Sequence, residues 1–201
     1  MRAIIKLILV LSMAGCTQNV MEPVDQNNQS IVENKEAEQL LEVVPHQLHG
    51  FVYTTTQTYP EPWGYSFRFI HESNPRIHAD IYVYPVPENL NLIDSKRIVL
   101  EMASQSLQEI DEAAKQGSYS DYQLIRNSSI EINGHFVTRS DIYLIRSNLA
   151  VYSLLFLTES KGTLIKARIS MPDNETNRSG SQWEEFVREM FSAILIHIRH
   201  S

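Results

Sequence analysis

The seven histidines of the chain are the side chains best suited to bind a metal ion. The best-placed pair is His71 and His78, because a turn at residues 74–75 (Asn-Pro) would bring their imidazoles opposite each other. A zinc site needs three or four ligands, and the acids near this pair are Glu72 and Asp80. We therefore predict no metal site and interpret both histidines as polar residues at strand ends.

The chain lacks the motifs that accompany common enzymatic reactions. Its seven glycines form neither a phosphate-binding cluster nor the Gly-x-Ser-x-Gly elbow of an α/β-hydrolase. Acidic residues close in sequence are interpreted as solvated helix faces rather than paired catalytic carboxylates: Glu109, Asp111, Glu112, Glu184 and Glu185. We therefore expect no catalytic residue, no cofactor and no enzymatic activity.

A turn rich in aromatic residues and proline spans residues 59–65. Tyr59, Trp63 and Tyr65 lie in it, and such side chains offer a large contact area at a small cost in side-chain entropy. We interpret these three residues as a contact surface for a partner. The alternative is that Trp63 covers the core and the prolines only stiffen the turn.

The N-terminal residues have the features of an export signal. Arg2 and Lys6 carry positive charge, and residues 3–13 are largely apolar. Residues 13–16 (Met-Ala-Gly-Cys) resemble the lipobox of bacterial lipoproteins, although that family prefers Leu at the position of Met13. The alternative is an unmodified cysteine in an ordinary secretory signal or in a buried helix.

The lipobox resemblance implies a lipid anchor. Residues 1–15 would be removed as a signal peptide, the thiol of Cys16 would receive a diacylglycerol, and the new amino end would be acylated. In lipoproteins of double-membraned bacteria, Asp after the cysteine signals retention in the inner membrane, whereas this chain has Thr17. The resemblance therefore implies an outer-membrane location facing the periplasm. Because the chain contains one cysteine, lipidation leaves no thiol for a disulfide or a metal site.

The composition is ordinary for a globular protein with one core. Of its 201 residues, 43% are hydrophobic, and 24 acidic residues against 17 Lys and Arg give a formal net charge of -7. This negative balance argues against nucleic acid as a partner. After the N-terminus, no apolar stretch approaches the roughly 20 residues that span a bilayer. We therefore expect the lipid on Cys16 to mediate membrane contact.

We predict three parts along the chain. Residues 1–15 form the signal peptide, residues 16–47 the lipidated N-terminus with a flexible tether, and residues 48–201 a single domain. The tether is rich in Asn and Gln and lacks aromatic residues, so it cannot bury enough apolar surface to fold alone. Within it, apolar residues at helical spacing indicate a short helix over 35–44 that either docks on the domain or forms only marginally.

Apolar alternation and turn residues predict the elements of the domain. Helices are predicted from a cap at Asp94 or Ser95 to Gly117, and from Ser181 onward. The dipeptide Asn133-Gly134 predicts a type I′ hairpin. Strands are predicted at 51–58, 65–71, 78–84, 122–132, 135–146, 151–157 and 163–171.

These elements indicate an α+β fold, in which an antiparallel sheet of about six or seven strands carries helices on its faces. The aromatic residues of two neighbouring strands are interpreted as core beneath a helix rather than as a ligand pocket: Phe67, Phe69, Tyr82 and Tyr84.

The order of three strands, a helix, four strands and a helix resembles the PsbP-like fold. This α/β/α sandwich occurs in lipid-anchored bacterial and photosynthetic accessory proteins. The resemblance covers residues 48–197 and is one of element order and apolar pattern, without a signature motif. It implies an accessory or binding role without conserved catalytic machinery, and it assigns no functional residue.

We therefore expect a membrane-anchored envelope lipoprotein that acts as a non-enzymatic accessory or binding protein for another envelope protein. The alternative is a small-molecule or lipid binding protein with a cavity between sheet and helix. A closed apolar pocket with a few converging polar groups would indicate that alternative. An enzyme would require two titratable groups in hydrogen-bond contact within a cleft, and the sequence indicates no such pair.

Overall fold

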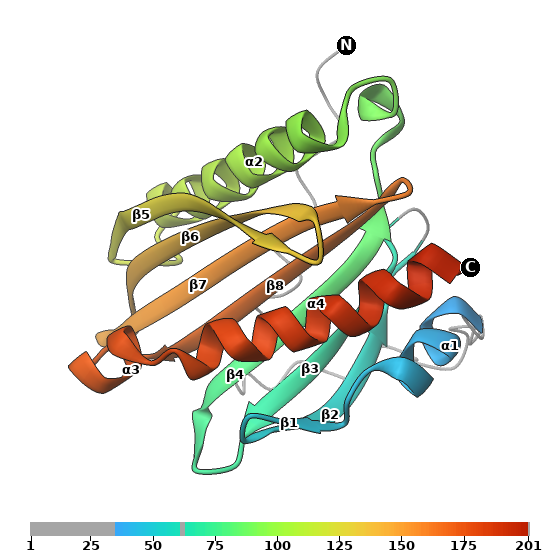
Figure 1. Ribbon diagram of the computed structural model, residues 1–201. Coiled ribbons are helices and arrows are strands. Elements are labelled where there is room, and N and C mark those ends of the chain that lie inside the picture. Colours follow the sequence, from blue (N-terminus) through green and yellow to red (C-terminus); the bar gives the residue numbers. More distant parts are fainter. Residues whose placement is uncertain (1–34, 61–62, 201) are drawn as a thin grey trace, which may run out of the picture.

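The computed structural model describes residues 35–60 and 63–200 (Figure 1). The predicted signal peptide, Cys16 and the first part of the predicted tether lie outside these residues. The elements in chain order are α1 (Lys35–Val43), β1 (Gln47–Leu48), β2 (Phe51–Thr58), β3 (Tyr65–His71), β4 (Asn74–Pro85), a 3-10 turn (Glu88–Leu90), α2 (Ser95–Lys115), β5 (Asp121–Ile132), β6 (His135–Arg146), β7 (Leu149–Ser160), β8 (Thr163–Pro172), α3 (Glu175–Ser179) and α4 (Gln182–His200).

The strands of the described residues form one antiparallel sheet of eight strands, in the order β1-β2-β3-β4-β8-β7-β6-β5. Two meanders, β1 to β4 and β5 to β8, meet where β4 pairs with β8, and α2 connects them. The predicted α+β fold class is confirmed, but the sheet has eight strands instead of the predicted six or seven. The additional strand is β1, which pairs with β2 across a turn at His49 and Gly50, both with positive φ. Strand β1 has only two residues, which is too short for an alternation of apolar and polar residues to be recognised in the sequence.

Helix α4 crosses one face of the sheet, as Figure 1 shows. Alternate residues of β8, among them Ile165, Ala167 and Ile169, point to this face and are fully buried. The apolar stripe of α4, which includes Phe186 and Met190, packs against them. Residues at i, i+2 and i+4 of a strand share one side, so this face of the sheet carries the main core.

Helix α1 belongs to the same packed layer. Ala37, Leu40 and Val44 are buried in the main core, and the helix lies against α4. Of the two alternatives for residues 35–44, the structure shows the docked helix. Its burial is what stabilises so short a helix, because isolated helices of this length are marginal in water.

Helix α2 packs on the opposite face of the sheet, mainly over β5, β6 and β7 (Figure 1). Its predicted cap is confirmed, since the Asp94 side chain accepts a hydrogen bond from the backbone N–H of Arg97 at 3.0 Å. Leu144, Leu155 and Leu157 lie under the helix in the buried clusters of this face. The same face of β2 and β3 carries polar side chains instead.

The hairpin between β5 and β6 turns at Asn133-Gly134, as the sequence predicts. The φ angles are 51° at Asn133 and 79° at Gly134, and Ile132 pairs with His135. Positive φ at both central residues is the requirement of a type I′ turn.

Two predictions about the β3–β4 hairpin were wrong. Strand β4 already begins at Asn74, and the register pairs Ile70, not His71, with His78. The His71 ring packs against Phe51 on the α4 face, whereas His78 lies on the α2 face. The register causes this separation, because His78 pairs with Ile70, and His71, the next residue of the strand, points to the opposite face.

The interpretation of four aromatic residues as one core face was also wrong. Phe67 and Phe69 are fully buried under α4. Tyr82 pairs with Ser66 and Lys166, so Tyr82 and Tyr84 lie on the opposite, α2 side of the sheet. The pairing of β3 with β4 determines which side chains share a face of the sheet. The sequence of each strand taken alone does not show that pairing.

Candidate functional site

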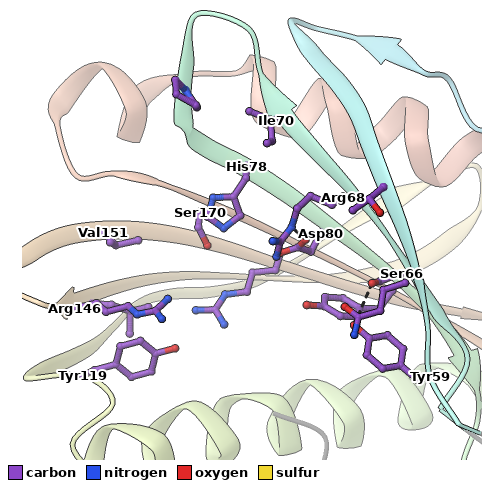
Figure 2. Close-up of a pocket in the computed structure, with 16 residues that line it drawn as sticks. Tyr59, Ser66, Arg68, Ile70, His78, Asp80, Tyr119, Arg146, Val151 and Ser170 are labelled. Carbon is purple, nitrogen blue, oxygen red and sulfur yellow. Dashed lines mark hydrogen bonds and ion pairs between the residues drawn. The ribbon is translucent and has the colours of Figure 1, made fainter. Parts of the chain in front are cut away.

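A pocket of about 520 Å³ lies on the α2 face of the sheet, beside that helix. Its floor comes from β2, β3, β4 and β8, and Tyr119 together with β6 and β7 closes one side. Figure 2 places Arg146 and Tyr119 at one end, Tyr59 and Ser66 at the other, and His78, Asp80 and Ser170 on the sheet between them. The volume is within the range of pockets that hold small molecules.

Three charged residues form a row across the floor of the pocket. In the strand register Arg68 pairs with Asp80, and Asp80 pairs with Arg168, so side chains from β3, β4 and β8 lie next to one another. The guanidinium of Arg68 binds the carboxylate of Asp80 in a bidentate manner, with N–O distances of 2.7 and 3.1 Å. Such forked pairs are the stronger type of ion pair.

Arg168 is held in a different way. Its Nε donates a hydrogen bond to the hydroxyl of Ser153 at 3.1 Å. Within the described residues, the guanidinium has no ion pair with a carboxylate. Both oxygens of Asp80, the acid beside it in the register, are bound by Arg68.

His78 lies two residues before Asp80 on β4, beside the row of charged residues, and pairs with Ser170 of β8. Burial lowers the pKa of the imidazole, and the charges of Arg68 and Arg168 lower it further, while Asp80 acts in the opposite direction. The neutral form is therefore favoured near neutral pH, and one ring nitrogen donates while the other accepts.

Lys166 on β8 lies on the other side of the row of charged residues, where it pairs with Tyr82 of β4. Its Nζ lies 5.0 Å from the ring centre of Tyr82 and 5.7 Å from that of Tyr84. Burial lowers the pKa of Lys166, with the charge of Glu109 opposing, and burial raises the pKa of Glu109 on α2. A further basic group thus lies close to the pocket floor.

Positive charge predominates in the pocket lining. Arg68, Arg146 and Arg168 face one acidic residue, Asp80, although the whole chain has a formal net charge of -7. A concave surface lined by one sign of charge concentrates ligands of the opposite sign. The arrangement is therefore suited to an anion.

The residues that the sequence suggested for partner contact lie in different surroundings. Tyr59 lines the pocket, and its hydroxyl is 3.2 Å from that of Ser66. Tyr65 is 7% exposed and packs against Phe67 at 5.5 Å between ring centres. Trp63 is partly buried in the turn. Cys16 lies outside the described residues.

Sequence reasoning did not identify the pocket residues Arg68, Asp80 and Arg168. The sequence did contain a signal: in these strands charged residues alternate with aromatic or aliphatic residues, so they share the polar side of each strand. On an exposed sheet face the same alternation is typical of solvated side chains. The pairing of β4 with β8 was needed to bring the three charges together.

The described part of the chain contains no group of three His, Cys, Asp or Glu side chains that could hold a metal ion. Among its helices none combines the length and the apolar character needed to cross a membrane.

No protein-family model matches this chain, and no curated protein matches it in sequence. Several solved structures are similar in backbone arrangement. The solution structure of cyanobacterial PsbP from Synechocystis matches with a TM-score of 0.49 and 12% identity, over 72% of this chain and 80% of that chain. It has the fold that the element order resembles.

Two further structures are similar to a lesser degree. A protein of unknown function from Pseudomonas aeruginosa matches with a TM-score of 0.43 and 12% identity, over 69% of this chain and 94% of that chain. The Ran-binding protein Mog1p of Saccharomyces cerevisiae matches with a TM-score of 0.41 and 8% identity, over 72% of this chain and 82% of that chain. At these scores and identities, the three likenesses carry no argument about function.

Proposed function

We propose that this protein is a non-enzymatic binding protein of the bacterial cell envelope that holds a small molecule in the pocket on the α2 face. The observation that supports the proposal is the pocket itself, of about 520 Å³, into which polar side chains from β2, β3, β4 and β8 converge. Of the two expected functions, the presence of a pocket favours small-molecule binding, although this pocket is open and partly charged and not the closed apolar cavity that we expected for that function. Charged and polar side chains lie among the apolar ones of its lining, which argues for a ligand with polar groups rather than a lipid chain.

The contacts within the pocket favour binding over catalysis. Arg68 binds both oxygens of Asp80, so this carboxylate is not available as a general base. In the described residues, His78 has no side-chain hydrogen bond to an acid that would orient it. A general acid–base pair requires such contacts.

A panel of small molecules provides the test of this proposal. The full-length chain in detergent is titrated with propionamide, propionate, glucose, glucuronate and glucose 6-phosphate, and binding is followed by the chemical shifts of backbone amides. At least one probe should perturb amides around the pocket on β3, β4 and β8. Gln57→Trp, which fills the pocket mouth from an exposed position, should weaken that binding at least about tenfold.

Gln123→Trp is the matched control, because Gln123 is exposed on β5, outside the pocket lining. It should leave binding unchanged. If no probe binds, or if Gln57→Trp and Gln123→Trp behave alike, the pocket is not the binding site.

The location is also part of the proposal. The lipobox-like residues 13–16 support attachment of lipid to Cys16, and several acyl chains on one residue suffice for stable anchoring. We place the domain at the outer membrane, facing the periplasm.

Replacement of the anchor residue tests this location. Cys16→Ser should release nearly all of the protein into the soluble periplasmic fraction, whereas the native chain should partition with the membrane and enter the detergent phase. Ser12→Ala in the signal segment serves as a control that keeps the cysteine. Equal partitioning of the native chain and Cys16→Ser would refute lipid attachment.

An accessory role toward another envelope protein is the second proposal. It is favoured by Trp63, which is incompletely buried in the β2–β3 turn and close in sequence to the pocket residue Tyr59. A partner that contacts this turn would lie beside the pocket, so the two roles are compatible.

A further inference from the structure

We propose that the pocket recognises its ligand through an oxyanion, a carboxylate or a phosphate, and that Arg168 is the side chain that binds it. This inference depends on the proposed ligand-binding function and specifies the chemical class of the ligand. It follows from the hydrogen bonds, the ion pairs and the sheet register around Arg168.

The terminal nitrogens of Arg168 are available to a ligand. Nε has its partner in Ser153, but Nη1 and Nη2 have no hydrogen-bond partner in the described part of the protein. In that part, every fully buried side-chain nitrogen or oxygen has a partner. The two Nη atoms are therefore not fully buried, and Arg168 is one of the side chains that line the pocket.

The orientation of this guanidinium is set in advance. The hydrogen bond from Nε of Arg168 to Ser153 of β7 fixes one edge of the guanidinium group. A guanidinium presents parallel N–H groups that match the two oxygens of a carboxylate or phosphate. Pre-orientation of this kind reduces the entropy lost when a ligand binds.

The acid next to Arg168 is already occupied by another arginine. Asp80 is the acid adjacent to Arg168, and its two oxygens are engaged by Arg68. Arg146 lines the same pocket. Lys166 lies two residues before Arg168 on β8, where the charge of Glu109 acts on it. A cation would be repelled here, whereas an anion would reduce the repulsion among these groups.

Neutral donors lie beside the charged centre. His78 and Ser170 occupy the neighbouring row of the sheet, and Tyr59 and Tyr119 line the pocket toward its two ends. Tyrosine rings and hydroxyls suit an organic body with polar groups. We therefore infer a small organic acid or phosphate ester rather than a free inorganic ion.

Pairs of probes that differ in charge test this inference on the full-length chain in detergent. Glucuronate and glucose 6-phosphate should bind at least about tenfold more tightly than glucose, and propionate more tightly than propionamide. The tighter of glucuronate and glucose 6-phosphate identifies a carboxylate or a phosphate as the preferred group. Binding should weaken as the salt concentration rises.

Three variants assign the effect to Arg168. Arg168→Gln should weaken binding of the preferred anion about tenfold to a hundredfold, because a hydrogen bond to a charged group is lost. Arg168→Lys keeps the positive charge but lacks the paired N–H groups of the guanidinium, so its affinity should lie between those of the native chain and Arg168→Gln. Arg97→Gln makes the same change of charge at an exposed position on α2 outside the lining, and should leave binding unchanged.

The outcomes separate this inference from the function on which it depends. Binding of glucose or propionamide as tight as that of the anions would overturn the inference and leave ligand binding in place. Anion binding that is unchanged in Arg168→Gln would also overturn it. Failure of all probes would contradict the proposed function itself. If Arg168→Gln does not fold, Arg168→Lys and the comparison of probes on the native chain still decide.

Discussion

Replacement of Asp141 by alanine is expected to lower the free energy of unfolding by about 3 to 5 kcal/mol. Asp141 on β6 is 0% exposed. Its carboxylate accepts hydrogen bonds from Arg139 at 2.8 and 3.2 Å and from the hydroxyl of Tyr152 at 2.7 Å. The variant leaves the mostly buried Arg139 with Glu184 as its acidic partner, and a buried charge that loses its main partner is strongly destabilising. Urea unfolding provides the measurement.

Asp121→Ala is the matched control for this experiment. Asp121 is exposed at the start of β5 and accepts a local bond from the backbone N–H of Tyr122, so the change should cost less than about 1 kcal/mol. Asp141 lies on the α4 face and the pocket on the α2 face, so a folded Asp141 variant should retain ligand affinity. A loss no larger than that of Asp121→Ala would show that Glu184 alone stabilises Arg139.

Replacement of Phe186 by alanine should also cost about 3 to 5 kcal/mol. Phe186 on α4 is 0% exposed, and its ring centre lies 4.4 Å from that of Phe51 and 5.5 Å from that of Phe69. The shortened side chain loses its contacts with Phe51 and Phe69 and leaves a cavity that the rigid sheet cannot close. The loss is measured as the change in urea midpoint at constant m-value.

Ile196→Ala on the same helix separates burial from helix propensity. Ile196 is 54% exposed, and its replacement should change stability by less than about 1 kcal/mol. If Phe186→Ala and Ile196→Ala cost the same, α4 does not pack on the sheet as described.

Several elements were predictable because their causes are local. The hairpin at Asn133-Gly134 follows from the positive φ angles that this dipeptide accepts. Helix α2 follows from a capping Asp94 and an apolar stripe at helical spacing. The stripe of α4 is equally evident in the residues from Trp183 to Leu195. In each case the signal lies within a single helix or a single tight turn.

The sequence by itself therefore determined the α+β class, the three longer helices and most of the strands, together with a prediction of lipid attachment at Cys16. Tertiary structure alone decided the register of β3 with β4, the docking of α1 and the row formed by Arg68, Asp80 and Arg168. Arg168 on β8 is far in the chain from Arg68 and Asp80, and a change of one residue in register would move a side chain to the other face. Long-range strand pairing sets that register, and no local pattern encodes it, so the pocket became visible only in the folded chain.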